Sequence, residues 1–165
     1  MNASTMKSLY ERFAVRTFDR LRDPLLLLLR ITWGWMFFQT GFGKLGNLAG
    51  TTGFFTSLGL PMPFVNAVVV GTLECVGGLL LIGGVASRVV AMLLAGNMLV
   101  AYLTAHRDAF GSLRAFVAAD PYPFLLAALL VLAFGPGRLS IDAWLRPAAG
   151  RSDRLAEPRA MRGHA

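Results

Sequence analysis

Four long runs of apolar residues constrain this chain more than any other feature of its sequence. They cover residues 24–42, 64–86, 89–105 and 121–135. A helix needs about 20 apolar residues to cross a hydrocarbon core about 30 Å thick, and the fourth run, about 22 Å long as a helix, is the shortest. Helices of a water-soluble bundle would carry a polar outer stripe, which these runs lack. The sequence therefore predicts an all-α polytopic membrane protein, a bundle of four transmembrane helices.

The composition agrees with a membrane location and argues against other classes of protein. Hydrophobic residues make up 55% of the chain and charged residues 15%, which excludes a disordered chain and disfavours an ordinary soluble domain. A net charge of +7 could suit nucleic acid, but the basic residues flank the apolar runs and no nucleic-acid-binding motif is recognisable. We therefore expect membrane lipid, and no nucleic acid, as a partner.

The distribution of basic residues predicts the orientation and divides the chain into three segments. Lys and Arg are concentrated before the first run and after the fourth, and positive charge favours the cytoplasmic side, so both termini are expected in the cytoplasm. Residues 1–23 form a basic segment, either an interfacial helix on an anionic leaflet or a solvated tail. Residues 24–145 form the membrane domain, and residues 146–165 are expected to be a disordered, basic cytoplasmic tail.

Each of the first three apolar runs offers one strongly polar residue for a buried site: Arg30, Glu74 and Asn97. An ionisable side chain in hydrocarbon costs from about 2.5 to more than 10 kcal/mol, so each requires a partner or a wet cavity. The long Arg30 side chain could reach the Glu74 carboxylate, and we therefore expect a buried polar cluster in which these two residues pair. Such a pair could act as a proton relay or substrate clamp, or could simply fix which helices are neighbours.

Small residues follow the faces of the first two spans that carry these charges. Gly34 and Gly41 follow Arg30 on the first span by successive steps of three or four residues through Phe37, and Gly71 and Gly78 flank Glu74 on the second at such steps. Glycines on a membrane helix let another helix approach closely. The sequence therefore predicts close packing of the two spans through these four glycines.

A second polar group is expected near the outer ends of the first and third spans: Gln39, Lys44, Tyr102 and His106. These side chains could line a mouth that admits the polar head of a ligand. A metal site is not expected, because His106 has no second His nearby and the single cysteine, Cys75, excludes a thiolate cluster. The sequence contains no Ser-His-Asp arrangement, phosphate loop or zinc spacing, so any enzymatic role lacks a self-contained catalytic motif.

The spacing of particular residues resembles the DoxX family of small four-helix bacterial inner-membrane proteins. The resemblance spans about residues 25–145 and ends in a closing stretch from Gly135 to Asp142. The other residues that carry it are Arg30, Gly34, Phe37, Gly41, Lys44 and Leu45, then Gly59-Leu60-Pro61, then Glu74, Gly77-Gly78, Leu81, Gly83 and Arg88. It implies a multi-pass protein of the bacterial inner membrane linked to redox chemistry, since relatives include the membrane subunit of a thiosulfate to quinone oxidoreductase. A single cysteine departs from any dithiol mechanism.

Three functions remain open at this point. The first is a membrane subunit or adaptor of a redox system that binds a quinone or small lipophilic substrate within the bundle, with a soluble or membrane redox partner. The second is a small-solute or proton-coupled transporter, for which a homo-oligomer is expected. The third is a passive membrane anchor whose basic ends recruit soluble partners.

Overall fold

The computed structural model describes residues 16–145, with side chains from residue 21 onward. Within that range the chain is helical and contains no strand, which confirms the all-α prediction. The expected basic segment 1–23 lies mostly outside these residues, and the expected tail 146–165 lies wholly outside them. The elements are α2 (Arg16–Gly46), α3 (Leu48–Ser57), α4 (Pro63–Gly83), α5 (Ser87–Thr104), the 3₁₀ helix η2 (Arg107–Gly111), α6 (Leu113–Ala118), α7 (Pro121–Phe134) and α8 (Ile141–Leu145).

Three of these helices are long and apolar enough to cross a membrane: α2 from Leu21 to Gly46, α4 and α5. The fourth apolar run forms α7, which has 14 residues and spans about 21 Å at 1.5 Å per residue. It begins at Pro121, which needs no N–H bond in the first turn, and ends before Gly135 at φ 74°. Asp120, at the N-cap position, makes no side-chain cap.

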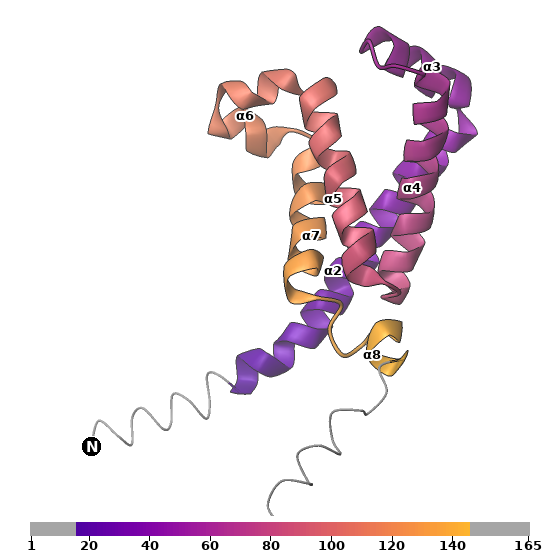
Figure 1. Cartoon of the computed structure of the whole chain (residues 1–165). Coiled ribbons are helices and arrows are strands. Elements are labelled where there is room, and N and C mark those ends of the chain that lie inside the picture. Colours follow the sequence, from indigo (N-terminus) through magenta and orange to yellow (C-terminus); the bar gives the residue numbers. More distant parts are fainter. Residues whose placement is uncertain (1–15, 146–165) are drawn as a thin grey trace, which may run out of the picture.

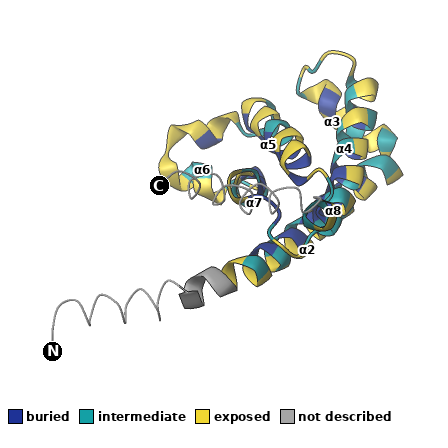
Figure 2. Cartoon of the chain, turned by 60° about the horizontal axis from the view of Figure 1, so that its bottom comes forward, coloured by how far each residue is buried: buried dark blue, intermediate teal, exposed yellow. Residues whose placement is uncertain are grey.

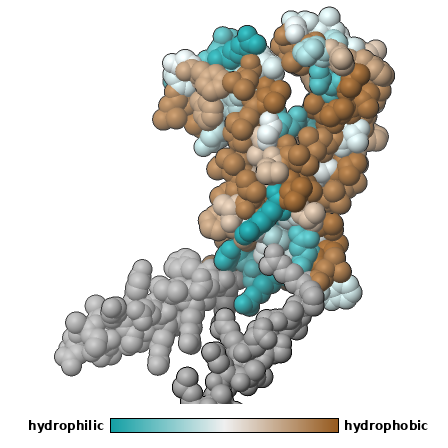
Figure 3. All heavy atoms as spheres, in the orientation of Figure 1, coloured by the Kyte–Doolittle hydropathy of each residue, from teal (hydrophilic) through white to brown (hydrophobic). Residues whose placement is uncertain are grey.

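The helices form two packed pairs that diverge toward one end. α2 packs along α4, and α5 packs along α7. The pairs approach each other at the end where α8 lies, called the α8 end, and separate toward the opposite end, called the α3 end, where α3 and α6 lie (Figure 1). Buried residues face the inside of this arrangement, while long strips of the outer faces of α4 and α5 are exposed (Figure 2). Apolar side chains dominate that outer surface (Figure 3), as lipid contact requires.

The contact between α2 and α4 is made by backbone rather than by side chains. A Cβ atom on Gly34 would lie 2.8 Å from the carbonyl oxygen of Gly78, and one on Gly41 would lie 2.7 Å from that of Gly71. A Cβ on Gly78 would likewise meet the α2 backbone, so Gly34, Gly41 and Gly78 accept only glycine without moving a helix, whereas a Cβ on Gly71 would meet the Leu45 side chain. The structure thus places the four glycines of the sequence analysis at this helix contact.

The turn between α4 and α5 is fastened by α8. α4 ends at Gly84, whose φ of 71° favours glycine and whose N–H donates to the carbonyl of Leu80 at 2.9 Å. At the start of α5, the carboxylate of Asp142 accepts hydrogen bonds from the N–H groups of Ala86 (2.7 Å) and Ser87 (2.8 Å). A carboxylate at a helix N-terminus satisfies donors that have no partner inside the helix.

Candidate functional site

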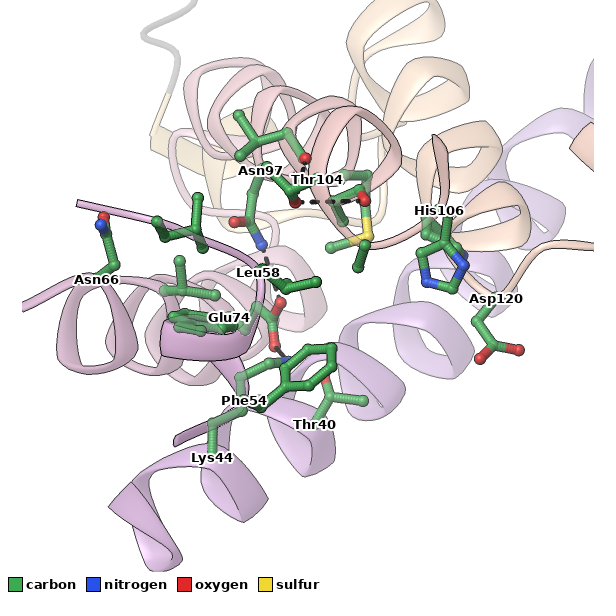
Figure 4. A pocket seen from close by; sticks show the side chains of 18 of the residues that line it. Thr40, Lys44, Phe54, Leu58, Asn66, Glu74, Asn97, Thr104, His106 and Asp120 are labelled. Atoms are coloured by element: carbon green, nitrogen blue, oxygen red, sulfur yellow. Dashed lines mark hydrogen bonds and ion pairs between the residues drawn. The ribbon is translucent and has the colours of Figure 1, made fainter. Parts of the chain in front are cut away.

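Glu74 is the centre of a buried polar cluster formed by three helices. It lies on α4 with only 2% of its surface exposed. Its Oε2 accepts a hydrogen bond from the Lys44 ammonium on α2 and forms an ion pair with it. Its Oε1 accepts a hydrogen bond from Asn97 Nδ2 on α5 at 2.8 Å. Figure 4 shows the carboxylate between these two donors. Both oxygens therefore have a donor, and the buried negative charge has an adjacent cation, as a low-dielectric site requires.

A cavity of about 260 Å³ opens directly above this cluster. It lies between α3 and α4 on one side and α5 and the start of α7 on the other, where the two helix pairs diverge. Most of its wall is apolar and partly aromatic, including Phe54, Phe55, Leu58 and Phe124. Its polar groups include the Glu74 cluster at the floor and a second set at the rim. A concave, mostly apolar space with a few convergent polar groups is the usual form of a small-molecule site.

Lys44 is the member of the cluster that a molecule in the cavity would reach first. Its side chain is 29% exposed, whereas that of Glu74 is 3% exposed. An ammonium has three N–H donors, and Glu74 accepts from one of them. The remaining donors are available to a ligand, and Glu74 both holds and compensates the positive charge.

The rim of the cavity carries a second pair of titratable groups. His106 precedes η2 and Asp120 precedes α7, and both line the cavity. Figure 4 shows them on the same side, away from Glu74. Among the described residues, no group of three or more His, Cys, Asp or Glu side chains could hold a metal ion.

Arg30 does not belong to this cluster, so the predicted pairing of Arg30 with Glu74 is wrong. α2 and α4 run antiparallel with Gly34 opposite Gly78, and this register puts Arg30 opposite Leu81 and Ile82. Those residues lie about 10–12 Å along α4 from Glu74 at 1.5 Å per residue. The apolar runs alone do not show which residues face each other, because helix packing, and not run length, sets the register.

The buried Arg30 guanidinium instead binds backbone carbonyls at the α8 end. Its Nε donates to Leu81 O at 2.9 Å and its Nη2 to Ile82 O at 2.8 Å, in the last turn of α4. Its Nη1 donates to Pro136 O and, at 3.1 Å, to Leu139 O, in the segment after α7. Helix C-terminal carbonyls have no partner inside the helix and attract cations. Arg30 thus ties α2 to the ends of α4 and α7.

The expected outer mouth is only partly assembled. Lys44 and His106 line the cavity, but Gln39 is exposed and does not line it. Tyr102 is 1% exposed and donates from its hydroxyl to Phe116 O at 2.7 Å, so it anchors α6 instead.

Sequence reasoning missed the contribution of α3 to the cavity. The Phe54-Phe55 pair lines the cavity wall, although no helix was expected between the first two apolar runs. The available signal was Asn47, whose side chain accepts from the N–H of Gly50 at 3.0 Å and caps α3.

Comparison with known proteins places the chain in a family. Residues 25–107 match the family model DoxX. Over 133 residues the chain is 31% identical to "Inner membrane protein YphA" of Escherichia coli (strain K12), covering 76% of this chain and 93% of that protein. It is 29% identical to "Inner membrane protein YqjF" of the same organism over 126 residues, 76% of this chain and 95% of that protein.

A third relative is similar over a shorter stretch. The chain is 40% identical to "Putative oxidoreductase CatD" of Bacillus subtilis (strain 168) over 78 residues, 47% of this chain. The match spans only 57% of that relative's length. No solved structure matches the chain significantly. The family match, the relatives named as inner membrane proteins and the three helices of spanning length show that the chain is a membrane protein that belongs to the DoxX family.

Proposed function

We propose that this protein binds a quinone or similar small lipophilic carbonyl compound in the cavity above Glu74. We further propose that the protein is a membrane subunit or adaptor of a redox system. The observation that carries it is the Lys44–Glu74–Asn97 cluster at the floor of a mostly apolar cavity. Such a floor can hold a polar oxygen while the walls hold an apolar body.

The charges of the floor favour a neutral ligand that accepts hydrogen bonds. Lys44 and Glu74 compensate each other, so the floor has no surplus charge to attract an ion. The Lys44 ammonium can donate to a carbonyl oxygen, and such a charge-assisted bond contributes about 1.5–3 kcal/mol. A bound quinone would supply redox chemistry by accepting electrons and protons, and Lys44 would hold and orient its carbonyl oxygen.

The size and walls of the cavity favour a small ring. A volume of about 260 Å³ lies just below the roughly 300–1,000 Å³ of sites for drug-sized ligands. The aromatic rings of Phe54, Phe55 and Phe124 offer faces and edges for packing against a flat ring. A single ring fits this volume, and an attached apolar tail would leave through the opening.

We extend the proposal to the membrane topology and the partners of the protein. We propose a multi-pass protein of the bacterial inner membrane, with α7 as a fourth, short span and both termini in the cytoplasm. A soluble or membrane redox partner would exchange electrons with the ligand, and a homo-oligomer is compatible with the exposed helix faces. The name of the Bacillus subtilis relative, an oxidoreductase, supports a redox role.

Quenching of tryptophan fluorescence by a short-chain quinone tests the binding step. The ring of Trp33 lies 5.2 Å from that of Phe124, which lines the cavity, so a bound quinone should quench it. The variant Lys44→Met with Glu74→Gln removes the ammonium without leaving a buried charge unpaired. It should weaken binding by roughly 10- to 100-fold, the value of a hydrogen bond to a charged group.

Arg114→Gln is the matched control, because Arg114 is an exposed cation on α6 that does not line the cavity. Its affinity should equal that of the original protein. Equal binding by the Lys44/Glu74 variant would contradict the proposal. Solute flux in proteoliposomes that depends on Glu74, without quinone binding, would favour a transporter. Loss of a soluble partner on removing residues 146–165 alone would favour an anchor.

A further inference from the structure

α7 ends early at the α8 end of the bundle. Its 14 residues span about 21 Å, against a hydrocarbon core about 30 Å thick. After Phe134 the chain leaves the helix through Gly135 and Gly137, both with positive φ. A helix of this length leaves part of the hydrocarbon thickness unspanned, and its last carbonyls need donors from outside the helix.

Two exposed arginines from other helices flank this helix end. Arg22 of α2 donates from Nη2 to Phe134 O at 2.9 Å, and its guanidinium carbon lies 5.6 Å from the centroid of the Phe134 ring. Arg88, in the first turn of α5, has its Nε 3.5 Å and its Nη2 3.6 Å from the position of a Cβ on Gly135. Both guanidinium groups thus lie beside the same peptide unit.

Two carboxylates at this end, those of Asp142 and Asp23, accept hydrogen bonds from backbone N–H groups. Asp142 accepts from the N–H groups at the start of α5. Asp23 accepts from the N–H of Arg138 at 3.0 Å and lies 3.9 Å from Arg138 Nε. Figure 3 shows hydrophilic side chains gathered here, directly below the apolar surface of the bundle.

The surface next to the two arginines is apolar. Leu25, Val89 and Phe134 are each more than half exposed, and each is within a few residues of one of the arginines or forms the helix end between them. A ligand that binds both the two arginines and this apolar surface needs an anionic head that accepts several N–H bonds and an attached apolar body. Guanidinium groups bind phosphate oxygens in a bidentate manner, which a compact ammonium cannot do.

We infer that Arg22 and Arg88 bind the phosphodiester of an anionic glycerophospholipid whose acyl chains lie on these apolar side chains. The lipid head group neutralises the two guanidinium groups and fills the space beyond the short α7. A zwitterionic phospholipid fits less well, because its own cation competes with the arginines for the phosphate. This site is separate from the cavity above Glu74 and does not depend on the proposed function.

Thermal unfolding of the full chain in neutral detergent tests the inference. Phosphatidylglycerol should raise the midpoint temperature, whereas phosphatidylcholine at the same concentration should raise it much less. Removing one basic residue near an anionic head group should weaken apparent affinity roughly five-fold. Arg88→Gln alone should therefore show about this loss, and Arg22→Gln with Arg88→Gln should show roughly 25-fold weaker binding. Each shift is compared with the same variant without lipid, so that lost stability does not count as lost binding.

Arg114→Gln again provides the control, because it removes an exposed arginine at the opposite end of the bundle. This variant should retain the full effect of phosphatidylglycerol. Equal stabilisation by the two lipids, or an undiminished effect in the double variant, would overturn the inference. Inorganic phosphate that reproduces the shift at equal concentration would also overturn it, since the site would then bind a free anion and not a lipid.

Discussion

Replacement of Arg30 by methionine should destabilise the protein by about 4 kcal/mol. Methionine keeps much of the side-chain volume but donates no hydrogen bond. The bonds to Leu81 O and Pro136 O are buried, and a hydrogen bond from a charged group contributes about 1.5–3 kcal/mol. The bonds to Ile82 O and Leu139 O are only partly buried, so water can replace them at little cost. The measured quantity is the free energy of unfolding in mixed micelles.

A double-mutant cycle distinguishes this role from the pairing suggested by the sequence. If Arg30 acts only on carbonyls, the free-energy costs of Arg30→Met and Glu74→Gln should be additive within about 0.5 kcal/mol. Lys44→Met and Glu74→Gln should instead be strongly non-additive, because their side chains are in direct contact. Coupling of more than about 1 kcal/mol between Arg30 and Glu74, or a cost below about 1 kcal/mol for Arg30→Met, would refute the reasoning.

Two further substitutions test how the helices are held together. Gly78→Ala should cost about 3 kcal/mol in thermal unfolding, because the new methyl group meets the α2 backbone, 2.6 Å from Phe38 N. Gly43→Ala, with nothing within 4 Å of the new atom, should be neutral or stabilising by up to about 1 kcal/mol, and equal effects at the two positions would be evidence against this helix contact. Asp142→Ala should cost about 1–2 kcal/mol by removing a helix cap, and an unchanged midpoint temperature would show that α8 does not fasten the α4–α5 turn.

The helices of the four apolar runs were predictable from sequence because their signals are local. The apolar runs follow from single-residue hydropathy, and α7 ends at Gly135 because that residue adopts a positive φ. The contact of Asn97 with Glu74 was also anticipated, since a buried carboxylate needs donors and few polar side chains lie in the spans.

The partner of Arg30 and the cavity were not predictable in the same way. Both depend on the register between antiparallel helices, which the glycine contacts of α2 and α4 determine. Lys44 was assigned to a separate outer group because it follows the apolar run, yet the register brings it to Glu74. The cavity exists because the two helix pairs diverge and α3 folds beside the opening. Neither feature can be predicted from the sequence of a single segment.

The central claim is that a lipophilic carbonyl compound occupies the cavity above Glu74. Photolabelling with a light-activated short-chain quinone, followed by peptide mass spectrometry, tests it most directly. The account predicts crosslinks on residues of the cavity wall such as Phe54, Leu58 and Phe124, competed by unlabelled quinone and lost when Lys44→Met is combined with Glu74→Gln. Labels confined to outward-facing residues such as Leu28 and Met92, unaffected by competitor or by the variant, would contradict it.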